Sequence, residues 1–273
     1  MSIGVLAHLF GKQPYEKLAA EIGQAGFDHV QLALWKAVES PDFNEAGKLS
    51  PGLARKIKDA FSKNGVSISV LACYLHLFER DEMKRKNHLE RFKELLRYAP
   101  SFGTRVVAVE VGKMPAGFTQ EDWTTLRASI HELLLEAEKW GVIIGIEPAN
   151  DHLIGDAKTL HEFLFEFPAT NLGVVLDPGN LLTADNLHNQ DAVIQEAFEL
   201  LGDRIVACHA KDRIMINNEI QTASPGRGKM NYDLYFQLLN KMKPGVDIIM
   251  EAANTPEERK QSKRFLDEMI FNA

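Results

Sequence analysis

Four short apolar segments of this chain each end in a side chain that could bind a metal ion. The segments cover residues 142–147, 172–177, 204–209 and 246–251, and they end in Glu147, Asp177, His209 and Glu251. An isolated ion in an apolar environment is very costly, so buried strands avoid such endings unless the group meets a partner. Four of them in one half of the chain, separated by helical patterns, predict a single cation held where parallel strands converge.

The types of these residues indicate which cation to expect. Three carboxylates and one imidazole form a mostly oxygen ligand set, which suits Mn²⁺, Mg²⁺ or Co²⁺ better than a structural zinc. Neighbouring carboxylates cannot all stay ionised without a cation, and a divalent ion would leave one net negative charge. We therefore expect one divalent metal ion, with Mn²⁺ as the first choice and Mg²⁺, Co²⁺ or Zn²⁺ as alternatives. A helix N-cap or a separate salt bridge would explain any one of the four, but not all of them together.

The composition limits what kind of protein carries this site. The 273 residues include 31 Lys+Arg against 38 Asp+Glu, a formal net charge of −7, which disfavours nucleic acid or an anionic membrane as a partner. Both cysteines, Cys73 and Cys208, lie in apolar strand-like runs and are expected to be core residues in a reducing compartment. Because no signal-peptide pattern and no membrane-length apolar run occurs, the sequence predicts a soluble, cytoplasmic protein.

Strand-like and helix-like patterns alternate along the chain. The predicted strands cover residues 3–8, 29–34, 66–73, 105–111, 142–147, 172–177, 204–211 and 247–251. The predicted helices cover residues 15–25, 51–64, 82–102, 119–140, 157–167, 189–201, 232–241 and 256–271. Most of the strands are continuous apolar runs, as expected when both faces of a sheet are covered.

This order predicts an α/β fold, a (β/α)8 TIM barrel that forms a single domain over residues 1–273. An open doubly wound sheet is disfavoured because no Gly-x-Gly-x-x-Gly turn follows the first strand. In such barrels the carboxyl ends of the strands surround one mouth, where active sites are found. Glu147, Asp177, His209 and Glu251 would end strands five to eight, which are neighbours.

The strand endings also resemble a known family. The similar segments are GIEP at residues 145–148, LDPGN at 176–180, HAKD at 209–212, PGRG at 225–228 and ME at 250–251. The resemblance is to the xylose-isomerase-like barrel superfamily, the sugar phosphate isomerase/epimerase proteins. The similarity runs over essentially the whole chain. It implies that Glu147, Asp177, His209 and Glu251 bind the metal, and that Glu147 and Glu251 face each other across the substrate as the catalytic proton-transfer pair.

The chemistry of such a pair follows from its parts. Isomerising or epimerising a sugar next to its carbonyl requires removal of a weakly acidic C–H proton and its return elsewhere. A divalent cation chelated by the substrate oxygens stabilises the enediolate that forms, while one carboxylate acts as base and the other as acid. We therefore predict a divalent-metal-dependent isomerase or epimerase that acts on a small sugar, keto-sugar or polyol.

Three positions depart from the epimerases of this family. Asn180 stands where a His is usual, Met215 where an Arg is usual, and Gln31 where a Glu is common. Since the family side chains contact substrate oxygens, two alternatives stay open: a non-catalytic metal-containing barrel that binds a sugar, and an inosose dehydratase-type lyase. An AP endonuclease is disfavoured, because its cluster needs additional histidines, one of them at position 180. The expected partner is a small sugar or polyol, without nucleic acid or membrane, and a homo-oligomer is compatible with the sequence.

Further side chains near the predicted mouth are candidates for substrate binding: Asn180, Lys211, Arg227, His76, Glu110, Trp35 and His8. Lys211 lies two residues past His209 and can point the same way, either to pair with a carboxylate ligand or to bind substrate. Arg227, in a Gly-flanked loop, could reach an anionic group or face solvent. His8 and His76 could each form a hydrogen bond within the protein or contact the substrate, and the sequence favours neither role. Glu110 is expected to support the ligands or bind substrate, and Trp35 to form an apolar wall or pack in the core.

Overall fold

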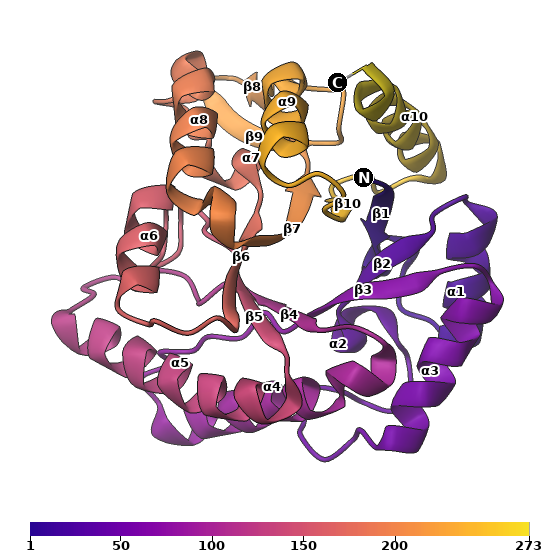
Figure 1. Cartoon of the computed structure of the whole chain (residues 1–273), viewed down its shortest axis with the longest axis vertical. Helices are drawn as coiled ribbons and strands as arrows, with labels where there is room; N and C mark the ends of the chain where they lie inside the picture. Colours follow the sequence, from indigo (N-terminus) through magenta and orange to yellow (C-terminus); the bar gives the residue numbers. More distant parts are fainter. Residues whose placement is uncertain (273) are drawn as a thin grey trace.

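In the computed structural model, which describes residues 1–272, eight parallel strands form a closed barrel (Figure 1). They follow the order β1-β10-β7-β6-β5-β4-β3-β2, and pairing of β1 with β10 closes the sheet. The strands are β1 (Ile3–Leu6), β2 (His29–Leu32), β3 (Ser67–Ala72), β4 (Val106–Val109), β5 (Ile143–Ile146), β6 (Leu172–Leu176), β7 (Ile205–Ala210) and β10 (Ile248–Met250). The predicted (β/α)8 fold is therefore confirmed.

Helices surround the barrel, as Figure 1 shows. They are α1 (Tyr15–Gln24), α3 (Pro51–Lys63), α4 (Glu82–Phe102), α5 (Gln120–Trp140), α6 (Ala157–Phe165), α8 (Gln190–Leu201), α9 (Tyr232–Met242) and α10 (Pro256–Asn272). Their ends follow local sequence signals. Thr119 and Asp122 form a capping box at the start of α5, and Gly141 ends that helix in the left-handed conformation. Within residues 1–272, no helix is both long and apolar enough to cross a membrane.

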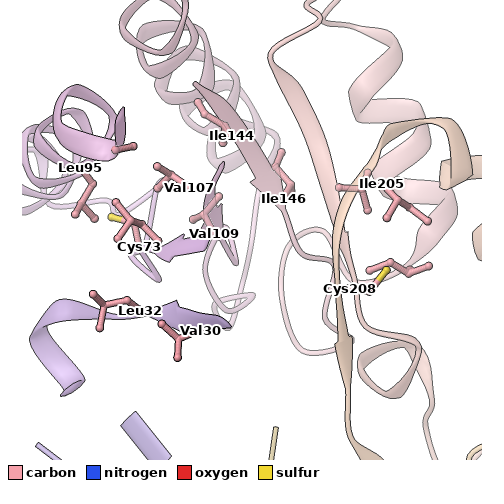
Figure 2. Close-up of a cluster of buried hydrophobic side chains, with 14 of the residues drawn as sticks. Val30, Leu32, Cys73, Leu95, Val107, Val109, Ile144, Ile146, Ile205 and Cys208 are labelled. Atoms are coloured by element: carbon pink, nitrogen blue, oxygen red, sulfur yellow. The ribbon is translucent and has the colours of Figure 1, made fainter. Parts of the chain in front are cut away.

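The apolar core has two parts because successive strand residues face opposite sides of the barrel wall. The larger part lies between strands and helices, and Figure 2 shows alternate residues of one strand, such as Val107 and Val109 of β4, pointing the same way. The smaller part lies inside the barrel and is formed by Leu6, Val70, Ala108, Val175, Ala207 and Ile249. This inner face determines which side chains reach the mouth.

Several short elements differ from the sequence prediction. Residues 7–10 form the 3₁₀ helix η1 (Ala7–Phe10) and residues 34–37 the helix α2 (Leu34–Ala37), where the prediction continued the strands to residues 8 and 34. Further short helices are α7 (Pro178–Leu181), η2 (Leu187–Asn189) and η3 (Gly202–Arg204). After β7 the chain forms an antiparallel hairpin, β8 (Asp212–Ile216) and β9 (Glu219–Ala223), which the prediction lacked.

Candidate metal centre

The strand pleat brings the predicted metal ligands to the barrel mouth. Glu251, His209 and Asp177 each lie two residues beyond an inward-facing core residue, namely Ile249, Ala207 and Val175. Because side chains repeat every two residues on a strand face, the inner column of each strand continues into a polar side chain where the strand ends.

The four predicted ligands lie close together at the barrel mouth. One ligand atom from each of Glu147, Asp177, His209 and Glu251 lies within 4.8 Å of the others. His209 Nδ1 is 3.0 Å from Glu147 Oε1 and 3.0 Å from Glu251 Oε1. The side chains of His209 and Asp177 are fully buried, whereas that of Glu251 is 15% exposed. The cluster therefore lies at the bottom of the mouth and reaches solvent through Glu251.

Asp177 supports a cation at this position. No donor among residues 1–272 reaches its Oδ1, and its Oδ2 faces Lys211 Nζ at 2.9 Å in an ion-pair contact without hydrogen-bond geometry. A buried carboxylate whose oxygens accept no hydrogen bond is rare, because the missing hydrogen bonds cost free energy. Coordination of a metal ion would compensate for the missing hydrogen bonds, so the four side chains, and Asp177 Oδ1 in particular, fit a divalent ion.

A ring of hydrogen bonds orients His209 in this cluster. Its Nε2 donates to Gln31 Oε1 at 2.9 Å, and the Gln31 amide nitrogen donates to the Tyr74 hydroxyl. Tyr74 in turn donates to Glu147 Oε2 at 3.3 Å. Because Nε2 carries its proton toward Gln31, Nδ1 is the nitrogen that faces the carboxylates. The ring thus fixes the ligand atom of His209, as outer partners of metal-binding histidines commonly do.

Lys211 pairs with two of the predicted ligands. Its Nζ lies 2.9 Å from Asp177 Oδ2 and 3.1 Å from Glu251 Oε2. Of the two roles that the sequence left open, the structure shows the ion pair with carboxylates. The four ligands and a divalent ion would carry the expected single negative charge, and the ammonium of Lys211 beside them offsets that charge.

The two carboxylates of the expected proton-transfer pair are shifted in opposite directions. Burial raises the pKa of Glu147, against the opposing charge of His209. Burial also disfavours ionisation of Glu251, but Lys211 and His209 outweigh it and lower its pKa. For His209, burial is outweighed by Glu147 and Glu251, which raise its pKa well above the ordinary value. Two carboxylates with divergent pKa values suit a pair of one acid and one base.

Asn180 and Glu110 both lie close to this cluster. Asn180, in α7, donates from Nδ2 to Glu147 Oε1 at 2.7 Å, so its amide supports a predicted ligand. Glu110 follows β4, and burial together with the charges of Glu147 and Glu251 raises its pKa to about 8. It would therefore be a neutral carboxylic acid at pH 7, able to donate a hydrogen bond.

The remaining candidates lie at different distances from the cluster. His8, in η1, has its pKa lowered to about 4 by burial and by Lys36, while Glu251 opposes this shift. The ring of Trp35, in α2, packs edge-on against Tyr74 with 6.4 Å between centroids. His76 bonds through Nε2 to the Lys113 carbonyl at 3.2 Å. These three residues follow β1, β2 and β3, so all of them lie at the carboxyl ends of barrel strands.

Arg227 has a partner elsewhere. It is exposed, and its guanidinium donates to Gln261 of α10.

Tyr74 is not among the site residues predicted from the sequence, although it follows β3 at the same end of the barrel as the others. Alternation along β3 could have indicated that Tyr74 faces inward, because it lies two residues beyond the inward-facing position 72. Its hydrogen bonds to Gln31 and Glu147 could not be predicted in this way, because they join residues that follow or belong to three separate strands.

Fold and site together define a (β/α)8 barrel with a candidate divalent-metal site at the carboxyl ends of its strands. The model of the xylose isomerase-like TIM barrel family matches residues 18–269, and the chain belongs to this family. This confirms the resemblance inferred from the strand endings. Among curated proteins, none matches the sequence significantly.

Solved structures with similar folds include sugar epimerases and metal-bound barrels. A D-tagatose 3-epimerase-like protein superposes with a TM-score of 0.80 at 20% identity, covering 100% of this chain and 98% of its own. A xylose isomerase-like TIM barrel protein from Mycobacterium smegmatis in complex with magnesium gives 0.75 at 16% identity, covering 99% and 97%. The IolI protein with a bound zinc atom gives 0.75 at 17% identity, covering 100% and 97%. At these identities the likeness shows the fold.

Proposed function

We propose that this protein is a divalent-metal-dependent isomerase or epimerase of a small sugar, keto-sugar or polyol. The observation that carries the proposal is the convergence of Glu147, Asp177, His209 and Glu251 within 4.8 Å, where the Asp177 oxygens accept no hydrogen bond from residues 1–272. Epimerases and metal-bound barrels among the similar folds support it. An oxygen-rich ligand set favours Mn²⁺, with Mg²⁺, Co²⁺ and Zn²⁺ as alternatives.

In this proposal Glu147, Asp177, His209 and Glu251 hold the ion. When bound, a divalent cation polarises substrate oxygens and stabilises the negative charge that develops on them. Glu251, partly exposed and paired with Lys211, accepts the proton from the carbon next to the substrate carbonyl. Glu147, buried and bound by Asn180 and Tyr74, returns a proton. His8, Trp35, His76 and Glu110 would contact the substrate around the mouth.

The proposal is tested by proton exchange in deuterated solvent. Metal-loaded wild-type protein is incubated with a panel of ketoses, aldoses and inososes, and products are followed by NMR. We expect one deuterium at a carbon adjacent to the carbonyl of one substrate class, and none after chelation of the metal. Loss of water from an inosose would instead identify the lyase alternative. Sugar binding without exchange would identify a binding barrel, the alternative that Asn180 and Met215 keep open.

We expect that the AP endonuclease alternative, disfavoured by the sequence, does not apply to this protein. The chain carries a net charge of −7, and association with DNA depends on cationic contacts to phosphates. We expect no measurable affinity for a duplex that contains an abasic site, measured by fluorescence anisotropy at low and moderate salt. Tight binding that weakens steeply with added salt would overturn this expectation.

A further inference from the structure

Lys211 is a buried cation inside a site that is itself proposed to hold a cation. Its side chain extends from the residue that follows β7 and is 8% exposed. Burying an ammonium is costly unless it meets an opposite charge. Its two partners, Asp177 and Glu251, are both predicted metal ligands, at 2.9 Å and 3.1 Å from Nζ.

The lysine contacts a single oxygen of each partner. Glu251 uses Oε2 for Lys211, whereas its Oε1 lies 3.0 Å from His209 Nδ1. Asp177 uses Oδ2 for Lys211, whereas its Oδ1 has no donor within the described part of the chain. One oxygen of each carboxylate therefore remains free of the ammonium, so the lysine and a metal ion can share these two residues.

The surrounding chain is shaped to hold the lysine. A Cβ at Gly179 would lie 2.9 Å from Lys211 Cγ and 3.0 Å from Asp177 Oδ1, closer than side chains normally pack. Glycine at this position therefore provides the space through which the lysine stem passes. The Tyr232 hydroxyl donates to the Lys211 carbonyl at 3.0 Å and holds its backbone. Two separate features thus place the ammonium between Asp177 and Glu251.

We infer that Lys211 is a fixed internal cation that sets the affinity of the centre for its divalent ion. Without the ion, the ammonium offsets the repulsion between Asp177 and Glu251 and keeps them close together. With the ion bound, the ammonium is a like charge nearby in a buried site, where repulsion is screened far less than in water. The lysine thereby stabilises the metal-free protein and weakens metal binding. This inference rests on the proposed metal site.

The test replaces the charge with an apolar side chain of similar length, Lys211→Met. We expect the metal-free variant to melt about 5 °C or more below wild type, because two carboxylates lose their buried partner. Its Kd for Mn²⁺, measured by isothermal titration calorimetry, should fall about tenfold or more as the repulsion disappears. Lys211→Gln is measured in parallel, because it removes the charge but retains polarity if the methionine variant folds poorly.

Lys113→Met is the matched control. Lys113 follows β4 at the same end of the barrel, but its side chain is 74% exposed and pairs with Asp151 on the surface. Solvent screens such a pair, so we expect no change in Kd or melting temperature. Wild type that binds no divalent ion would overturn both the proposed function and this inference. If wild type binds Mn²⁺ and both Lys211→Met and Lys211→Gln bind it equally well or more weakly than wild type, this inference alone is overturned.

Discussion

Replacing Glu251 with glutamine is expected to slow exchange of the substrate's carbon-bound proton roughly 10²–10⁴-fold in metal-saturated protein. An amide keeps the shape of the side chain but cannot accept a proton. Glu251 combines partial exposure with a lowered pKa, which keeps it ionised and accessible to a substrate. The neutral amide is also a weaker ligand, so metal affinity should fall. Added metal should restore occupancy, measured by calorimetry, without restoring exchange.

Asp247→Asn is the control for this variant. Asp247 lies directly before β10, at the opposite end of the strand from Glu251, and its side chain is 46% exposed. Removing this carboxylate should leave exchange unchanged, because that end of a barrel does not carry the active site. If the Glu251→Gln variant exchanges the substrate proton at the wild-type rate, Glu251 is not the base. Glu147 and Lys211 would then be the next residues to test as the base.

Replacing Asp177 with alanine is expected to raise the Kd for Mn²⁺ by at least about two orders of magnitude. Loss of an outer partner of a metal ligand already costs about 10–100-fold, and loss of a ligand should cost at least as much. Asp177 contributes two buried oxygens, and Lys211 is their sole close charged partner among residues 1–272. The variant should keep the barrel fold, because Lys211 retains its ion pair with Glu251, at 3.1 Å, after Asp177 is removed.

The measurement is metal content after dialysis, together with the rise in melting temperature on addition of Mn²⁺. Wild type should retain the ion and melt at a higher temperature in its presence, since a ligand that binds the folded state stabilises it. Asp177→Ala should show neither effect, whereas Asp247→Asn should behave as wild type. Equal metal content in wild type and Asp177→Ala would show that Asp177 is not a ligand and that the proposed site does not hold the ion.

The regular elements could be predicted from local patterns, but the short connecting elements could not. Apolar runs and helix caps located the eight barrel strands and the eight surrounding helices to within a few residues. The hairpin β8–β9 was missed, although its turn residues Asn217 and Asn218 both adopt positive φ and Asn-rich turns are typical of hairpins. Its strands alternate weakly and pack little apolar surface, so the hydrophobic pattern gave no signal there.

The predicted metal ligands came together because each follows an apolar strand, a signal that the sequence carries locally. Their contacts with other residues did not follow from the sequence. Which of its two possible roles Lys211 takes depends on Gly179, which leaves space for its stem, and this is a property of the packed barrel. The bond between Gln31 and His209 joins positions 178 residues apart, a pairing that the strand order creates.

The proposed function depends on one divalent ion bound among Glu147, Asp177, His209 and Glu251. Such an ion can be located by diffraction from crystals grown with Mn²⁺, recorded at a wavelength where manganese scatters anomalously. We expect one strong anomalous peak within about 2.0–2.4 Å of an oxygen from each carboxylate and of His209 Nδ1. We also expect Lys211 to remain against Asp177 and Glu251. A peak elsewhere, or no peak in crystals that turn over a substrate, would show that the four side chains do not hold the ion.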